Sequence, residues 1–237
     1  MNVAGIIGGL SPESTCHYYK WLCDGVRAQK GGLHYPEILM ATINQQFIYE
    51  NKKAGDWAAI AERIVAKASV LERAGADFLL IASNTMHNVS DQVEAAINIP
   101  LLHIADTTAA HITQVSLSTV GMVSTIESAE MDFYKERLRR QNIEVLVPAQ
   151  KNEREKIDKI INDELCKGKV NPDSKVFFID QANALFARGA QGLILGCTEI
   201  DMLVDQKDFA RPVFDTTRIH VDEALGMILS PHAPAPA

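Results

Sequence analysis

Short apolar runs alternate with segments of helical hydrophobic spacing along the whole chain. Runs rich in Val, Ile, Leu and Phe predict strands, and apolar residues that recur every three or four positions predict helices. Strands are expected at 3–7, 37–43, 78–82, 101–104, 119–123, 144–148, 193–196 and 213–214. Helices are expected at 15–29, 56–74, 88–96, 129–141, 153–164 and 175–188. This alternation predicts an α/β fold built around mostly parallel sheets.

The chain also matches itself, because segments of one half recur in the other half in the same order. The matching pairs are 3–9 with 119–125, 75–85 with 189–199, and the Asp-Thr-Thr triplet at 106–108 with the one at 215–217. We therefore expect two pseudo-symmetric three-layer lobes with the active site in the cleft between them. Residues 1–98 and about 212–237 would form the first lobe, and residues from about 99 to 211 the second.

Composition and charge then narrow the classes of function. Lys and Arg number 23 against 30 Asp and Glu, and a surface of net charge −7 repels nucleic acid and anionic lipids. The apolar run at 78–82 is far shorter than the roughly 20 residues that span a bilayer, so we expect no membrane partner. The start of the chain lacks the basic segment of a secretory signal, which predicts a cytoplasmic protein. The four cysteines show no zinc-ligand spacing, so no metal site is expected.

Ser83 and Cys197 occupy matching positions in the duplicated segments, each directly after an apolar strand. Ligands of open α/β sheets collect at the carboxyl ends of strands, where helix N-termini offer free N–H groups. Two such residues facing each other could remove a proton from one face of a carbon and return one to the other face. A helix N-terminus would lower the pKa of the Cys197 thiol and stabilise charge on the substrate, so neither a metal nor an organic cofactor is needed.

Three motifs make the chain resemble the aspartate/glutamate racemase family. They are GGLSPEST at 8–15, SNTMH at 83–87 and GCTEI at 196–200, which are similar to the family signatures GGMxxEST, CNTMH and GCTEI. The similarity covers essentially the whole chain and is strongest toward the bacterial L-aspartate/glutamate-specific branch. It implies two pseudo-symmetric α/β lobes, racemisation of an amino acid without pyridoxal phosphate or another cofactor, and a homodimer.

The resemblance assigns the acid/base pair and shows one departure from the family pattern. Cys197 matches the second catalytic thiol, and Ser83 stands where most members have the first. A serine hydroxyl is a far weaker acid than a thiol, so turnover would be biased toward the direction in which Cys197 abstracts, or impaired. An engineered replacement of cysteine by serine would give the same sequence, and both aspartate and glutamate stay open as substrates.

The resemblance also implies substrate-binding positions. Side chains that would hold the α-amino and α-carboxylate groups are Asn84, Thr85, Thr125, Thr198 and Glu199. Backbone N–H groups of the turn containing Leu10 and Ser11 would contribute further donors. A dicarboxylic substrate needs a cation for its side chain, and the resemblance places Lys52 and Lys167, or else Lys53 and Lys169, in that role.

Two other functions remain open. Relatives with one cysteine in this architecture act as decarboxylases or isomerases that protonate an enediolate from one face, and the missing thiol favours that alternative. Two lobes around a cleft also describe a non-catalytic amino-acid-binding protein, although the retained Cys197 argues against it.

Overall fold

The computed structural model describes residues 1–231, so residues 232–237 of the expected first lobe lie outside the described residues. The described residues form two compact units: Met1–Ala82, Val89–His103 and residues 220–231 form the first, and Ser83–Asn88 with Ile104–Ile219 form the second. The lobe boundaries expected near 98 and 212 lie at 103 and 219 in these units. Residues 83–88 fall in the second unit because their side chains bond to it.

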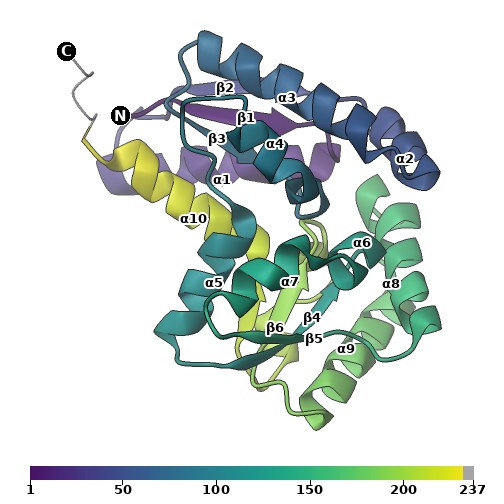
Figure 1. Ribbon diagram of the computed structural model, residues 1–237. Coiled ribbons are helices and arrows are strands. Elements are labelled where there is room, and N and C mark those ends of the chain that lie inside the picture. The colour runs from purple at the N-terminus through teal and green to yellow at the C-terminus, as the bar shows by residue number, and fades with distance from the viewer. Residues whose placement is uncertain (232–237) are drawn as a thin grey trace. The chain divides into compact units, whose positions relative to one another are not determined.

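The first unit contains a three-stranded parallel sheet of order β2-β1-β3. Its strands are β1 (Ala4–Gly8), β2 (Ile38–Thr42) and β3 (Phe78–Ile81), and its helices are α1 (Pro12–Lys30), α2 (Gln45–Ala54), α3 (Trp57–Arg73), α4 (Ser90–Glu94) and the end of α10 (Thr216–Leu229). Helices α1 and α10 cover one face, where Ile6 and Leu80 pack against Leu22 and Leu225. Helix α3 packs along the same sheet, and Figure 1 shows it on the opposite face.

The second unit contains a four-stranded parallel sheet of order β5-β4-β6-β7. Its strands are β4 (Thr119–Ser124), β5 (Glu144–Leu146), β6 (Leu193–Gly196) and β7 (Val213–Asp215), and its α-helices are α5 (Ile104–Gln114), α6 (Ile126–Glu130), α7 (Asp132–Arg139), α8 (Lys151–Asp163) and α9 (Pro172–Ala187). Short 3₁₀ turns are η1 (Thr85–Val89), η2 (Leu165–Lys167), η3 (Ile200–Met202) and η4 (Gln206–Asp208).

Side chains of the second sheet alternate between two cores, as the period of a strand requires. Val123 and Leu195 face one core with residues of α8 and α9. Met122 and Ile194 face the other core with residues of α5 and α7. Figure 1 shows these two helix pairs on opposite sides of the sheet, so this unit has three layers.

The two sheets share one strand order, which confirms the duplication expected from the sequence. In each sheet the first strand along the chain is central and is flanked by the second and the third. Leu101 forms a single parallel bridge to Leu79 of β3, just as β7 pairs with β6. The α/β class with two parallel-sheet units is therefore correct.

Several predicted elements differ from the structure. The strand expected at 101–104 is one bridge at Leu101, because Ile104 already begins α5. The helix expected at 88–96 is the short turn η1 followed by α4, and the one at 129–141 is divided at Met131, whose ψ of 155° is extended. Helices α2, α5 and α10 were not predicted.

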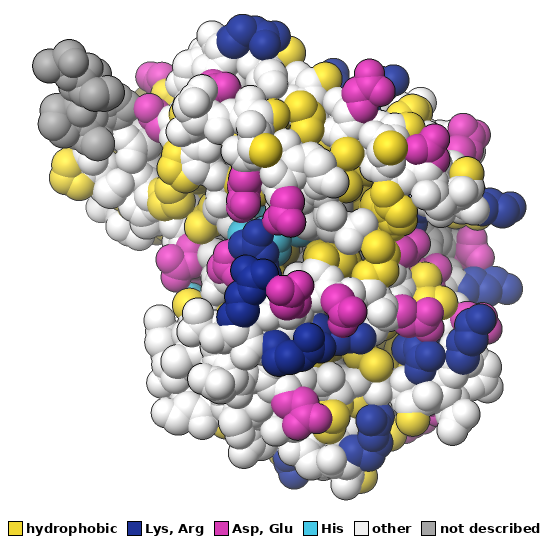
Figure 2. Space-filling view, viewed as in Figure 1, with side chains coloured by type: hydrophobic (Ala, Val, Ile, Leu, Met, Phe, Trp, Pro, Cys, Tyr) yellow, Lys and Arg dark blue, Asp and Glu magenta, His cyan; other side chains and the backbone are white. Residues whose placement is uncertain are grey.

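The described residues include no helix that is long and apolar enough to cross a membrane. Figure 2 shows acidic and basic side chains interspersed over the visible face.

Candidate active site

The segment Ser83–Asn88, which we call the Ser83 segment, is fixed to the carboxyl end of the second sheet. Thr85 Oγ1 lies 2.8 Å from the hydroxyl of Thr125, the residue directly after β4, and Ser128 of α6 completes a buried hydroxyl cluster. Asn84 Nδ2 donates to Thr216 Oγ1 at 2.9 Å, and Thr216 donates in turn to the carbonyl of Leu195 in β6 at 2.8 Å. The segment is therefore bonded both beside β4 and to β6.

This hydrogen-bond chain determines the orientation of the Asn84 amide. The single hydroxyl proton of Thr216 goes to the Leu195 carbonyl, so Thr216 can only accept from Asn84, and Nδ2 must face it. Asn84 is 2% exposed, and its Oδ1 is buried without a hydrogen-bond partner. A buried acceptor that lacks a partner is costly, which makes Oδ1 a site for a donor from a ligand.

Cys197 follows β6 directly, and a buried carboxylate faces its thiol. The Sγ atom donates to Glu199 Oε2 at 2.9 Å, and the Thr198 hydroxyl donates to the same oxygen at 2.9 Å. Thr198 and Glu199 are each 3% exposed. The end of β6 therefore brings three of the residues named from the sequence, a thiol, a hydroxyl and a carboxylate, into direct contact.

The expected lowering of the Cys197 pKa is wrong in direction. Burial raises the pKa of the Cys197 thiol well above its ordinary value, and the negative charge of Glu199 and then the nearby Cys166 raise it further. The turn after Cys197 is η3, three residues long, and not the helix that the expectation required. Cys197 is therefore protonated in the free protein near neutral pH and is a proton donor in that state.

Burial also perturbs the carboxyl group of Asp201, four residues after Cys197. Burial raises the pKa of Asp201 to about 7, and the charges of Asp215 and Glu199 add to the increase. Asp215 ends β7 and caps α10 by accepting from the N–H groups of Thr217 and Arg218. Among the described residues, no group of three His, Cys, Asp or Glu side chains is arranged to hold a metal ion.

The turn after β1 belongs to the first unit. Gly9 has a φ of +72°, and a Cβ there would lie 2.4 Å from the Ile43 carbonyl oxygen, so only glycine fits. Its N–H already donates to Thr15 Oγ1 at 2.8 Å. Ser11 is buried and caps α1 by accepting from the Ser14 N–H, with Leu10 between Gly9 and Ser11. The role expected for Leu10 and Ser11 in substrate binding stays a prediction.

The two lysines expected to bind the substrate side chain lie on different elements. Lys52 lies in the last turn of α2, in the first unit. Lys167 lies in η2 and forms an exposed ion pair with Asp163 at 3.3 Å, four residues earlier. The assignment of both lysines to the substrate side chain stays a prediction.

Two residues that bond to the candidate site are not among those predicted from the sequence. Thr216 carries the bond to Asn84, and Ser128 joins the hydroxyls of Thr85 and Thr125. The repeated Asp-Thr-Thr triplet at 215–217 is the one sequence signal that pointed to either of them.

Comparisons with known proteins agree with this fold. The model of the Asp/Glu/hydantoin racemase family matches residues 7–224. A protein from Yersinia pestis assigned to the Asp/Glu racemases has a TM-score of 0.89 and 40% identity, with 97% of this chain and 100% of that chain covered. An aspartate racemase homologue from Pyrococcus horikoshii OT3 has a TM-score of 0.83 and 32% identity over the same shares.

A curated relative is the broad specificity amino-acid racemase RacX of Bacillus subtilis. It is 26% identical over 147 residues, which are 60% of this chain and 63% of RacX. The matched part thus spans less than two thirds of that relative. Two α/β units with one strand order place the protein in the structural class of the amino-acid racemases. The chain belongs to the Asp/Glu/hydantoin racemase family.

Proposed function

We propose that this protein racemises aspartate or glutamate without a cofactor, with Cys197 as the main acid/base and Ser83 on the opposite face. The observation that carries the proposal is the contact between the Cys197 thiol and the buried Glu199 carboxylate at 2.9 Å. It provides a proton donor and a proton acceptor at the end of one strand. Membership of the racemase family supports the reaction type.

Polar groups around the two residues suit an amino acid. The unpartnered Oδ1 of Asn84 would accept a hydrogen bond from the α-ammonium group. The Thr125 hydroxyl donates to Ser128, so the proton between Thr85 and Thr125 belongs to Thr85, which would turn from Thr125 to donate to the α-carboxylate. Thr198 holds Glu199 in place through the bond between their side chains.

The reaction begins with the transfer of a proton within the site. The positive charge of the bound α-ammonium group stabilises the Cys197 thiolate, so the thiol proton can pass to Glu199. The thiolate removes the α-proton, and the electron pair of the broken C–H bond moves onto the α-carbon and its carboxylate. Ser83 relays a solvent proton to the opposite face, the new C–H bond forms, and Glu199 returns its proton to solvent.

The serine makes the two directions unequal. A hydroxyl is a poor base, so abstraction on the Ser83 face would be slow, whereas donation through a solvent relay is easier. We therefore expect faster turnover of the enantiomer whose α-proton faces Cys197.

Proton NMR of L- and D-aspartate and of L- and D-glutamate in D₂O, followed by chiral chromatography, tests the proposal. The expected result is loss of the α-proton signal together with formation of the opposite enantiomer from at least one substrate. Cys197→Ala should abolish both events while circular dichroism shows an intact fold. Retained racemisation in Cys197→Ala would exclude the mechanism.

A Ser83→Cys variant tests the opposite face. A thiol there should raise the rate from the slower enantiomer relative to the faster one. If the natural chain shows neither α-proton exchange nor inversion and Ser83→Cys shows both, the serine has disabled the racemase. Equal rates from both enantiomers in the natural chain would contradict the direction bias.

A second candidate function follows from the protonated state of Cys197. A thiol whose pKa is raised by burial is suited to protonate a carbanion from one face. In a disubstituted malonate, loss of CO₂ leaves its electron pair on the α-carbon, and the Cys197 proton would complete the new C–H bond. Release of CO₂ with formation of a single enantiomer, and no α-proton exchange in amino acids, would favour this decarboxylase over the racemase.

We also propose a homodimer. In the first unit, the exposed apolar side chains include Tyr19 at 52%, Leu33 at 88%, Tyr35 at 43% and Met40 at 40%. Met40 lies in β2, an edge strand of its sheet, and exposed apolar edges are typical of protein interfaces. Sedimentation velocity should give twice the 26.1 kDa chain mass, and Met40→Lys should weaken the association. A monomer at micromolar concentration would refute this proposal.

A further inference from the structure

We infer that His87 is a positioning residue for the Ser83 face of the site, acting through the Ser83 carbonyl group. His87 is 1% exposed and lies in η1, four residues after Ser83. Its Nδ1 lies 2.8 Å from the Ser83 carbonyl oxygen, and its Nε2 lies 3.3 Å from the backbone nitrogen of Ile104. The inference rests on the proposed racemase function and assigns a role that the resemblance did not give to this histidine.

The two contacts determine the protonation state of the ring. A backbone N–H can only donate, so Nε2 of His87 must be the acceptor and carries no proton. The Ser83 carbonyl can only accept, so the proton is on Nδ1. His87 is therefore a neutral imidazole in the Nδ1–H tautomer, and it is already engaged at both nitrogens.

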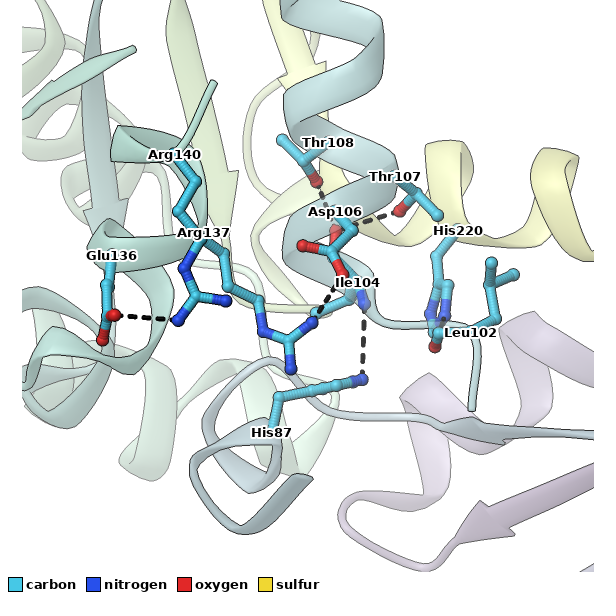
Figure 3. A network of polar contacts seen from close by, with 10 residues as sticks. All are labelled: His87, Leu102, Ile104, Asp106, Thr107, Thr108, Glu136, Arg137, Arg140 and His220. Carbon is cyan, nitrogen blue, oxygen red and sulfur yellow. Dashed lines mark hydrogen bonds and ion pairs between the residues drawn. The ribbon is translucent and has the colours of Figure 1, made fainter. Parts of the chain in front are cut away.

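His87 thus bridges the Ser83 carbonyl and the Ile104 N–H, and the Ile104 end of this bridge is rigid. Ile104 is the first residue of α5, and its N–H is one of the helix-end donors that have no partner within the helix. Figure 3 shows His87 reaching this end from below, while Arg137 of α7 pairs with Asp106 in the first turn at 2.5 Å. Hydroxyls of two threonines in that turn also bond to the Ile104 carbonyl.

The Ser83 end of the bridge determines where the serine hydroxyl lies. The carbonyl belongs to the same residue as the side chain, so fixing it restricts rotation about the Cα–C bond next to the atom that carries the serine side chain. Asn84 and Thr85 hold the positions that follow Ser83 in the chain, and His87 bonds to Ser83 itself. Displacement of a reacting group by about 1 Å can cost two orders of magnitude in rate.

Two conservative substitutions separate the two ends of the bridge. His87→Asn places an amide N–H where Nδ1 was and can keep the bond to Ser83, whereas it does not reach Ile104. His87→Gln places an amide oxygen near the former Nε2 and can keep the bond to Ile104, whereas the donor to Ser83 is lost. Both variants replace the ring by a smaller polar side chain, so each is a matched control for the other.

The readout is the ratio of inverted product to α-deuterated but uninverted substrate in D₂O. Exchange without inversion needs Cys197 alone, and inversion also needs the Ser83 face. Partial unfolding lowers both quantities equally and leaves the ratio unchanged. We expect His87→Gln to lower the ratio by about tenfold and His87→Asn to keep it within about twofold of the natural chain.

An unchanged ratio in His87→Gln, or an equal fall in both variants, would overturn the inference. Absence of exchange in the natural chain would instead count against the proposed racemase. Nitrogen-15 NMR of the natural chain gives an independent test that needs no stable variant. A proton on Nδ1 of His87 supports the bridge, and a proton on Nε2 contradicts it.

Discussion

Replacing Thr216 by valine should destabilise the protein by breaking the bond that holds the Ser83 segment to β6. Thr216 is fully buried, accepts from Asn84 Nδ2 at 2.9 Å and donates to the Leu195 carbonyl at 2.8 Å. Valine has nearly the same shape, so no cavity forms, but the Asn84 amide donor loses its partner inside the protein. The loss of both bonds and the unsatisfied buried donor should cost about 2 to 4 kcal/mol.

Thr107 offers a control because it occupies the matching place in the first copy of the Asp-Thr-Thr triplet. It is 6% exposed and donates to the Ile104 carbonyl at 2.9 Å. That carbonyl also receives the Thr108 hydroxyl at 2.7 Å, so Thr107→Val leaves it bonded. The expected cost is about 1 kcal/mol or less.

Urea denaturation of Thr216→Val, Thr107→Val and Thr216→Ser measures the difference. Thr216→Ser keeps the hydroxyl and should recover most of the loss. The racemisation rate at low substrate concentration should fall in Thr216→Val, since Asn84 is no longer held. If the unfolding free energies of Thr216→Val and Thr107→Val agree within about 0.5 kcal/mol, the reasoning from buried unsatisfied groups is wrong for this site.

Three further predictions use other features of the chain. Gly9→Ala should lower the free energy of unfolding by at least about 1 kcal/mol more than Gly31→Ala does. Both glycines have a positive φ, but only at Gly9 would the added Cβ clash with a backbone oxygen, so equal losses would refute this reasoning. The pKa of Asp201 is raised to about 7 in the folded protein from about 3.9 in the unfolded chain, so the folded protein binds this proton more tightly. The contribution of Asp201 to the free energy of unfolding therefore falls as the pH rises from 4 to 7. Asp201→Asn should remove this pH dependence from urea denaturation curves. The thiolate absorbance at 240 nm, taken as the difference from Cys197→Ala, should appear only at a pH above that of an ordinary thiol, and earlier in Glu199→Gln; a thiolate present at neutral pH in the natural chain would show that burial does not control this group.

The strands could be predicted from the sequence because parallel strands are buried on both faces. Phe78–Ile81 is a continuous apolar run, and the structure buries all of it. Helix α10 could not be recognised in the same way. Ile219 belongs to the core of the second unit, whereas Val221 and Leu225 belong to the core of the first. A helix that serves two cores has apolar residues on more than one face, and the one-sided pattern disappears.

The sequence indicated which candidate residues lie together better than it indicated their protonation states. The family resemblance named Asn84, Thr85 and Thr125 as candidates, and the structure brings the last two into contact. The direction of the Cys197 pKa shift depends on burial and on the orientation of Glu199, which spacing along the chain does not determine. The expected lowering of the Cys197 pKa also required a full helix after Cys197, where the structure has only the three-residue turn η3. A boundary between apolar and polar residues predicts that the strand ends there, but it does not predict the length of the element that follows.

The duplication makes the two halves alike in fold and unlike in proton chemistry. In the aligned segments Ser83 corresponds to Cys197, Asn84 to Thr198, and Thr85 to Glu199. The Cys197 side therefore has a carboxylate that can take the thiol proton, and the matching position on the Ser83 side is a threonine engaged with Thr125. His87 does not replace the missing carboxylate, because its Nδ1 proton is directed to a backbone carbonyl. A thiol introduced at position 83 would thus lack a neighbouring proton acceptor, so Ser83→Cys should narrow the difference between the two directions without removing it.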